Sequence, residues 1–428
     1  MTDGNKLIEL EQPPITETAI LARLVLPGES PEDVDESLDE MKQLARTAGA
    51  LVTQVFVQYR PQPAPATLIG KGKVEEIKAA IEEAETDLVI FDSDLTPAQG
   101  SKLEEALGVK IVDRTQLILD IFAQRAHTTE GKHQVELAQL QYLLPRLAGR
   151  GSVMRQQGGI GVRGPGEQKL EVDRRVIRKR IQRLKDEIED VRRTRQVQRK
   201  RRVEETLGTV ALVGYTNAGK SSLLNALTGA HVFVEDKLFA TLDPRTRRCK
   251  LPSQNEVVLS DTVGFIRKLP HSLVAAFRAT LEEVTEADLL LLVADSSHPA
   301  VDEHILAVYD VLEEIKALDK PIIYVLNKTD AAEPERVQQL LRAGGHRVAV
   351  SAHTGEGLDS LLREIDERLS LNRHVVTLRI PQSDAGLISR LHKSGKILSQ
   401  HYEDNTIVVE AEIGRALEGL VSEYITQS

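Results

Sequence analysis

The 428-residue sequence predicts an α/β fold that is divided into several domains. An apolar run at 209–213 precedes a glycine-rich turn at 214–219 and a segment of helical periodicity at 222–227, the pattern of a buried strand, a tight turn and a helix. Strand-like and helical segments also alternate between residues 20 and 114, as in a second, smaller α/β unit. We expect five regions: a flexible tail at 1–19, a small α/β domain at 20–114, a long antiparallel helical hairpin at 115–205, a central α/β domain at 206–371 and a small α+β domain at 372–428.

Composition excludes several classes of protein. The single cysteine, Cys249, excludes an intramolecular disulfide framework, and no Cys/His cluster has the spacing of zinc ligands. The first residues do not form a signal peptide, and no apolar run approaches the ~20 residues of a membrane-spanning helix. We therefore expect a soluble protein of the cytoplasm. Separately from this argument, we expect it to be a monomer.

The small α/β domain is predicted from its alternating pattern and its turn signals. Strands are expected at 19–25, 51–59, 87–91 and 110–112, and helices after Ser30 and at 72–85 and 96–107. The basic turn at 70–73 lacks the spacing of a phosphate loop, so a simple turn before a helix is favoured over a second nucleotide site.

Two repeats of apolar residues predict the helical hairpin. Residues 115–147 have helical character, and a second helical segment follows a glycine-rich break. Spacings of three and four residues form the seam along which two helices pack. The first repeat consists of Leu137, Leu140, Leu144 and Leu147, and the second of Ile177, Ile181, Leu184, Ile188 and Val191.

Charge is unevenly distributed along the chain. The net charge is −10, but residues 146–205 contain 19 Lys/Arg against 9 Asp/Glu, so the rest of the chain carries −20. Seven of the 18 residues at the tip of the hairpin, 149–166, are glycine, and none is acidic. A solvated charged helix would have mixed signs, whereas this positive excess favours contact with RNA phosphates. The candidate RNA-binding residues are Arg150, Arg155, Arg163, Arg174, Arg175, Arg178 and Lys179.

The glycine-rich turn has the phosphate-binding pattern G-x-x-x-x-G-K-S. Gly214 and Gly219 allow backbone N–H groups to point at phosphate oxygens, at a helix N-terminus that favours negative charge. Lys220 would neutralise the β- and γ-phosphates during catalysis, and the Ser221 hydroxyl would bind Mg²⁺. The candidate nucleotide-binding residues here are Gly214, Tyr215, Thr216, Asn217, Ala218, Gly219, Lys220, Ser221 and Ser222.

Two later segments complete the γ-phosphate side of this site. Thr241 would offer Mg²⁺ a second hydroxyl and the γ-phosphate its backbone N–H; Thr246 is the alternative, and spacing does not decide between them. The run Asp261-Thr262-Val263-Gly264 follows a strand. Asp261 would hold Mg²⁺ through water, and the catalytic N–H of Gly264 would contact the γ-phosphate.

The base is specified by the motif Asn327-Lys328-Thr329-Asp330. The Asp330 carboxylate can only accept hydrogen bonds, and guanine offers two adjacent donors on the edge where adenine offers none. Asn327 would tie this loop to the phosphate loop, and Lys328 would cover the base. The run Ser351-Ala352 ends a further strand, where a backbone N–H can reach guanine O6. The four motifs together predict a GTP- or GDP-binding site.

These motifs resemble the translation-factor class of GTPases, and the flanking stretches are similar to the HflX family of bacterial ribosome-associated GTPases. The similarity covers residues 20–428 and includes the stretches at 163–167, 214–221, 240–244 and 261–266. It implies binding to the large ribosomal subunit near the peptidyl-transferase region. It also implies separation of stalled or idle 70S ribosomes into subunits under stress such as heat shock. Family members have been associated with ATP hydrolysis and RNA unwinding too, although no residue here locates a separate ATP site.

Two residues bear on the rate of hydrolysis. Phe265 occupies the position where many GTPases place a water-orienting glutamine, so we expect slow intrinsic hydrolysis that a partner activates. Asn217 resembles the asparagine of GTPases that hold K⁺ beside the phosphates; the alternative is that it only suits a tight loop.

The C-terminal region predicts a compact βαββα unit for docking to protein or RNA. Its strands are expected at 375–380, 397–402 and 406–411, and its helices at 385–392 and 414–424. Two other functions stay open for the whole chain. One is an RNA-remodelling protein whose affinity is tuned by nucleotide, and the other is a GTPase that assists ribosome assembly.

Overall fold

The computed structural model describes most of the chain as two compact units. The described residues are 17–154, 165–203, 208–229, 238–267, 270, 273, 281–371, 373–384, 386–394, 396–403, 405–414 and 421–426. One unit consists of Met1–Ala126 with Lys132–Asp186, and the other of His127–Gly131 with Glu187–Ser428. The five domain limits expected from the sequence stay predictions.

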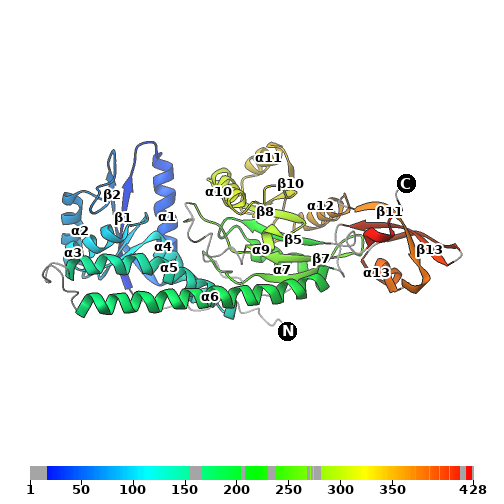
Figure 1. Ribbon diagram of the computed structural model, residues 1–428. Helices are drawn as coiled ribbons and strands as arrows, with labels where there is room; N and C mark the ends of the chain where they lie inside the picture. The colour runs from blue at the N-terminus through cyan, green and yellow to red at the C-terminus, as the bar shows by residue number, and fades with distance from the viewer. Residues whose placement is uncertain are drawn as a thin grey trace, which may run out of the picture. The chain divides into compact units, whose positions relative to one another are not determined.

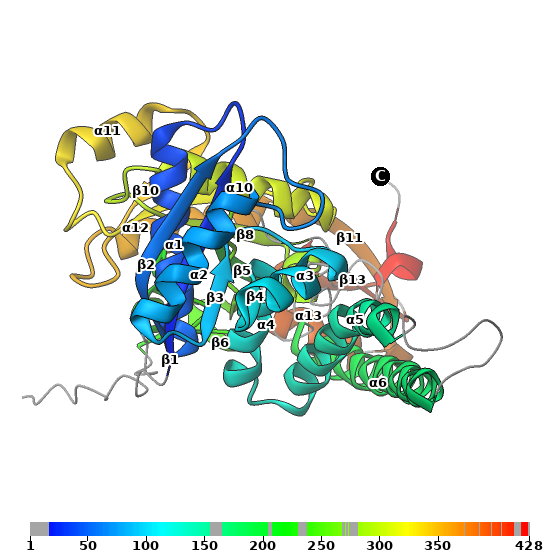
Figure 2. The same ribbon diagram turned by 90° about the vertical axis from the view of Figure 1, so that its left-hand side faces the viewer.

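The first unit contains a four-stranded parallel sheet with the order β2-β1-β3-β4 (Figure 1, Figure 2). Side chains alternate along β1, so Ile20 and Ala22 join α2 and α3 in one core, whereas Arg23 bonds to α1 on the other face. The elements are β1 (Glu17–Val25), α1 (Pro31–Ala48), β2 (Ala50–Tyr59), α2 (Lys71–Ala84), β3 (Leu88–Phe91), α3 (Pro97–Leu107), β4 (Lys110–Asp113) and α4 (Arg114–Arg125).

A buried ionic network lies at the carboxyl ends of these strands. Asp92 accepts hydrogen bonds from Arg23, from Ser37 at 2.7 Å and from Arg114 at 2.8 Å. Arg114 also pairs with Glu40 of α1. Because a buried charge is costly without partners, this mutual pairing indicates a structural network that fixes α1 and α4 on the sheet.

The expected helix over 115–147 is wrong at one point, because the chain breaks between α4 and α5 (Thr129–Met154) at residues 126–128. The long helix α6 (Pro165–Val203) follows. Within the first unit, α5 and the beginning of α6 lie side by side (Figure 2). Arg180 of α6 donates to both carboxylate oxygens of Glu136 of α5 at 2.6 and 2.7 Å, and this bonding lowers the pKa of Glu136. Leu184, four residues after Arg180 on α6, is fully buried.

The candidate RNA-binding residues lie on α5, on α6 and between them. Residues 155–164, with Arg155 and Arg163, lie outside the described residues, as does the side chain of Arg150. Among the others, Arg174 is half-buried, whereas Arg175, Arg178 and Lys179 are exposed.

The second unit contains a six-stranded sheet with the order β10-β9-β8-β5-β7-β6, in which β6 is antiparallel to β7 and the other neighbours are parallel. Val210 and Leu212 of β5 pack with α7 and α12, whereas Ala211 and Val213 pack with α10, so helices cover both faces. Its elements are β5 (Thr209–Gly214), α7 (Lys220–Thr228), β6 (Arg245–Lys250), β7 (Glu256–Asp261), α9 (Glu282–Thr285), β8 (Leu289–Asp295), α10 (Val301–Glu314), β9 (Ile322–Asn327), α11 (Pro334–Arg342), β10 (His346–Ala349) and α12 (Leu358–Leu371). This is the P-loop α/β architecture that the sequence predicts, and the fold class is confirmed.

The cysteine on β6 is enclosed by this core. Cys249 is 3% exposed, and its thiol donates to the Leu227 carbonyl at 3.3 Å. Burial raises the pKa of the Cys249 thiol.

Within the described ranges, none of the helices combines the length and apolarity needed to cross a bilayer.

The C-terminal region forms a three-stranded antiparallel sheet with the order β11-β13-β12. Its elements are β11 (Arg373–Pro381), η2 (Gln382–Asp384), α13 (Gly386–Ser394), β12 (Lys396–Glu403), β13 (Thr406–Gly414) and η3 (Ser422–Tyr424). The helix expected at 414–424 is wrong at both ends, because Gly414 pairs with Arg373 in the sheet and the described end is a 3-10 turn. Residues 415–420 of that expected helix lie outside the described residues.

Candidate nucleotide-binding site

The turn after β5 forms a close backbone cradle. Gly214 has φ 155°, and a Cβ there would lie 2.2 Å from the Val293 carbonyl oxygen of β8. Gly219 has φ 91° at the start of α7, and a Cβ there would lie 2.3 Å from the Asn327 side-chain nitrogen. Neither position can hold a side chain, and the turn between them ends at the N-terminus of α7, where anions bind.

Lys220 is the buried cation of this cradle. Its Nζ donates to the Gly214 carbonyl at 3.1 Å and to the Tyr215 carbonyl at 2.8 Å. Burial lowers the pKa of Lys220 to about 8, and the nearby Asp261 charge partly opposes this shift. A phosphate placed in the cradle would restore the charged form, because it supplies the negative charge that this buried ammonium lacks.

Three oxygen-bearing side chains meet beside this lysine. The Ser221 hydroxyl donates to Asp261 Oδ2 at 2.5 Å and lies 2.9 Å from the Thr241 hydroxyl. Burial raises the pKa of Asp261, and its Oδ1 has no hydrogen-bond partner within the described part of the chain. An unpartnered carboxylate oxygen beside two hydroxyls is a donor set of hard oxygens, which fits Mg²⁺. Thr246, the alternative to Thr241, instead lies in β6, opposite Ser260 of β7.

The segment after Asp261 is bonded to the phosphate turn. Phe265 N–H donates to the Gly214 carbonyl at 3.1 Å, and Thr216 N–H donates to the Phe265 carbonyl at 2.7 Å. Thr262 donates its hydroxyl to the β5 carbonyl of Leu212 at 2.6 Å. A Cβ on Gly264 would lie 2.8 Å from the Thr216 Cα and 3.0 Å from Lys220 Nζ, so the backbone here lies against the phosphate turn. Phe265 is 1% exposed and packs in the core, as expected for a residue that cannot orient water.

The base-recognition residues meet at the ends of β9 and β10. Asn327 donates to the Ala218 carbonyl at 2.9 Å and accepts from Ala352 N–H at 3.0 Å, so it ties both loops to the phosphate turn. The Ser351 hydroxyl donates to Asp330 at 2.6 Å and lowers the pKa of that carboxyl. Asp330 is exposed and ready to accept hydrogen bonds from a ligand.

The two residues before Asp330 are also held by neighbouring strands. Lys328 has φ 60°, and its ammonium lies 2.7 Å from Asp295 of β8. Thr329 N–H donates to the Val350 carbonyl.

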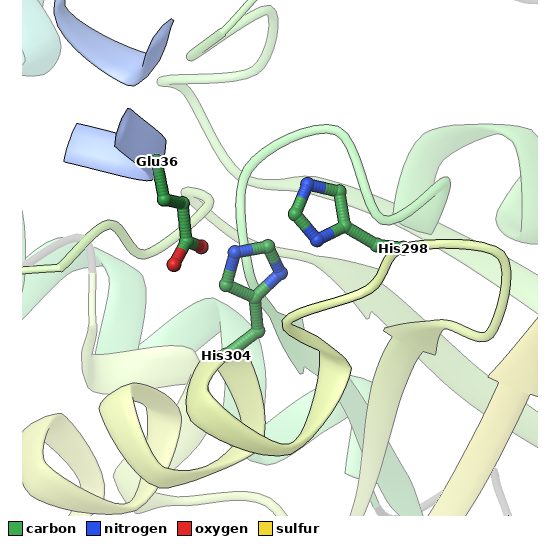
Figure 3. A group of neighbouring side chains, drawn as sticks. All are labelled: Glu36, His298 and His304. Carbon is green, nitrogen blue, oxygen red and sulfur yellow. The ribbon is translucent and has the colours of Figure 1, made fainter. Parts of the chain in front are cut away.

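A side chain that the motifs do not include packs on Tyr215. The His304 ring stacks on the Tyr215 ring with a centroid separation of 3.7 Å and an angle of 7°. His298 lies against His304 (Figure 3) at 4.4 Å between centroids. Burial lowers the pKa of His304 to about 3, so the stacked ring is neutral. The Tyr215 hydroxyl accepts from Arg267 N–H at 2.8 Å. No local motif marks α10, and this support was missed by sequence reasoning.

The structure therefore brings together the candidate residues of the phosphate turn, Thr241, the run at 261–264 and both base loops. Asn217 has φ 63° and an exposed side chain. Two other predicted residues lie in the same segments. They are Val263, which is buried, and Ser222, which is half-buried on α7.

Family models match four consecutive parts of the chain. They are described as GTP-binding GTPase N-terminal (residues 35–123), GTP-binding GTPase Middle Region (125–202), 50S ribosome-binding GTPase (209–328) and HflX C-terminal domain (337–418).

Sequence similarity to known proteins covers most of the chain. GTPase HflX of Caldanaerobacter subterraneus subsp. tengcongensis is 50% identical over 399 residues, which cover 93% of this chain and 91% of that protein. GTPase HflX of Escherichia coli is 46% identical over 373 residues, which cover 86% of this chain and 88% of that protein. A GTP-binding protein from the archaeon Sulfolobus solfataricus, solved in complex with GDP, is 26% identical with a TM-score of 0.43, covering 83% of this chain and 99% of that chain.

The identity to curated relatives and the four consecutive family matches agree with the geometry of the phosphate turn and the two base loops. The chain therefore belongs to the HflX family of GTPases, and the nucleotide that this site binds and hydrolyses is GTP.

Proposed function

We propose that this chain is a ribosome-associated GTPase that binds the large ribosomal subunit and separates stalled or idle 70S ribosomes into subunits under stress such as heat shock. The observation that carries the proposal is the joint presence of a complete guanine-nucleotide site and an exposed basic helix in one chain. Arg175, Arg178 and Lys179 lie exposed on α6, where they are available to RNA phosphates. The family model that matches residues 209–328, described as a 50S ribosome-binding GTPase, supports the same partner.

In the proposed mechanism, the chain's own residues position the triphosphate. The turn at 214–219 presents its N–H groups, and Lys220 moves its charge from the turn's carbonyls to the β- and γ-phosphates. Gly264, held against Thr216, offers its N–H to the γ-phosphate. Asp330 and Ala352 recognise guanine. The conformation of the segment after Asp261 then depends on whether the γ-phosphate is present.

A bound Mg²⁺ would neutralise the charge on the phosphates. Ser221 and Thr241 would hold it directly, and Asp261 would hold it through water, as their grouping suggests. A K⁺ ion beside Asn217 is a further proposal, supported by the exposed side chain on the turn. Equal hydrolysis rates in KCl and NaCl would remove it. The ATP hydrolysis implied by the resemblance stays a prediction.

GTP hydrolysis by the purified protein alone should be slow, because Phe265 is buried and cannot orient water. Large ribosomal subunits should make it faster. The stimulation should fade as salt increases from ~50 to ~200 mM, since phosphate contacts release counterions. Turnover should be measured with and without subunits across this range, and sucrose gradients should show loss of 70S particles with GTP.

Charge-reversal variants sharpen this test. Replacing Arg175, Arg178 and Lys179 by glutamate should weaken stimulation and its salt dependence. A control that reverses the exposed Lys71, Lys78 and Lys102 changes the net charge equally and should have little effect. RNA unwinding without ribosomes would instead indicate an RNA-remodelling protein. Accumulation of precursor subunits in cells without the protein would indicate an assembly factor.

A further inference from the structure

Asp243, two residues after Thr241, is bonded to the start of the first hairpin helix. One carboxylate oxygen accepts the N–H groups of His127 and Thr128, each at 2.9 Å, and the other accepts the Thr128 hydroxyl. All three groups precede α5 and lie in the same compact unit as Asp243. A single side chain of the nucleotide-sensing loop thus caps a helix that is distant in sequence.

The chemistry of this contact suits a carboxylate. Thr128 accepts from Gly131 N–H at 3.0 Å, so its hydroxyl caps the helix while it donates its own proton to Asp243. A negative charge is also favoured at a helix N-terminus. Hydrogen bonds to an ionised acceptor are stronger than those between neutral groups.

Gly131 provides a second, independent observation. A Cβ at this position would lie 2.4 Å from Asp243 Oδ1 and 3.1 Å from the Thr128 hydroxyl. Glycine lowers helix stability relative to alanine, so its presence in the first turn of α5 has a local cost. The close approach of the Asp243 carboxylate accounts for it.

The bonded carboxylate fixes the loop that carries Thr241. Leu242, between the two residues, is 1% exposed and leaves the loop little freedom. With Asp243 held on α5, the Thr241 hydroxyl lies 2.9 Å from that of Ser221. We propose that Asp243 is a positioning residue for GTP hydrolysis, which acts by holding Thr241 at the Mg²⁺ and γ-phosphate position through its contact with the start of α5.

This inference rests on the proposed role of Thr241 and extends it to the hairpin. Because coupling between two sites is reciprocal, a γ-phosphate that draws Thr241 inward also strengthens the cap, and GDP leaves it weaker. The first turn of α5 is therefore expected to be most ordered in the GTP-bound protein.

The test uses the full chain without ribosomes. Asp243→Ala should lower kcat about tenfold, which corresponds to ~1.4 kcal/mol, and should weaken binding of a non-hydrolysable GTP analogue while GDP affinity stays at the wild-type value. Thr128→Ala should have the same effect in smaller measure, and Thr128→Ser, which keeps the hydroxyl, should restore the wild-type behaviour. Hydrogen exchange at the His127 and Thr128 amides should be slower with the GTP analogue than with GDP, and this difference should vanish in Asp243→Ala.

A matched control exists in the same unit. Asp366 accepts Ser253 N–H and the Ser253 hydroxyl, both at 2.8 Å, and neither residue belongs to the nucleotide site. Asp366→Ala should leave kcat and GTP-analogue affinity unchanged. Wild-type kcat in Asp243→Ala, or exchange at 127–128 that is the same with both nucleotides, would overturn the inference. An equal loss of GDP and GTP-analogue affinity would overturn it too. If Asp243→Ala does not fold, Thr128→Ala decides by the same readouts, and intact GDP binding separates this outcome from a failure of the guanine site.

Discussion

Replacing Lys220 by alanine is expected to lower the rate of GTP hydrolysis at saturating nucleotide by about a hundred- to a thousandfold, the usual effect of removing a group that stabilises transition-state charge. The lysine is the buried cation of the phosphate turn, and its ammonium bonds to the Gly214 and Tyr215 carbonyls, which a triphosphate would replace. Single-turnover hydrolysis with and without large ribosomal subunits measures the loss. Lys250→Ala, which removes an exposed lysine of β6, is the control. Hydrolysis within a few fold of wild type would contradict the role of Lys220.

The same variant tests a dependence of stability on pH. Burial lowers the pKa of Lys220 to about 8 from 10.5, so between these values the folded, nucleotide-free protein has released a proton that the unfolded chain retains. The unfolded state binds more protons in this interval, and the contribution of Lys220 to the free energy of unfolding therefore rises with pH. Urea unfolding between pH 7.5 and 9.5 should show a steeper rise for wild type than for Lys220→Ala. Parallel curves would mean that folding does not lower the pKa of Lys220.

Replacing Asp330 by asparagine is expected to lower GTP affinity by about a hundred- to a thousandfold, because a site built to bond a polar group rejects a partner that leaves it unpaired. The Ser351 hydroxyl at 2.6 Å lowers the pKa of this carboxyl, which can accept both guanine donors. Asparagine would place an amide donor against one of them. Xanthine has a carbonyl at that position, so xanthosine triphosphate should bind better to the variant than GTP does.

Competition between the two nucleotides for the variant and for wild type measures this exchange. Asp319→Asn, at an exposed aspartate of the same unit, should leave the preference for guanine unchanged. A variant that loses both nucleotides equally would show that Asp330 supports the loop and does not select the base.

The parts of the site that the sequence predicts are those whose chemistry is local. The phosphate turn and the base loops combine special backbone angles with fixed side-chain types, as at Gly219 and Asp330, so their pattern survives in the sequence alone. The choice between Thr241 and Thr246 is different, since it depends on how the loop that carries Thr241 folds onto Ser221. Only the three-dimensional arrangement brings Thr241 to that hydroxyl and puts Thr246 in a strand.

The break within the helix expected at 115–147 was missed for a related reason. Residues 115–147 have helical propensity throughout, and the break at 126–128 occurs where Asp243 accepts the N–H groups of His127 and Thr128. A cap supplied by a distant residue leaves no periodic signal, although Thr128 itself is a residue type that often precedes a helix. The stacking of His304 on Tyr215 is equally invisible in sequence, because it joins an ordinary helix position to the phosphate turn.

The enclosure of Cys249 has a practical consequence for spectroscopy. Its thiol is the only one in the chain, is 3% exposed and has a raised pKa, so it reacts slowly with maleimides. A cysteine pair introduced by Lys78→Cys and Leu306→Cys, at exposed positions on α2 and α10, would therefore carry fluorescent dyes without prior removal of a native thiol. Energy transfer between such dyes would follow the separation of the two units through a cycle of GTP binding and hydrolysis.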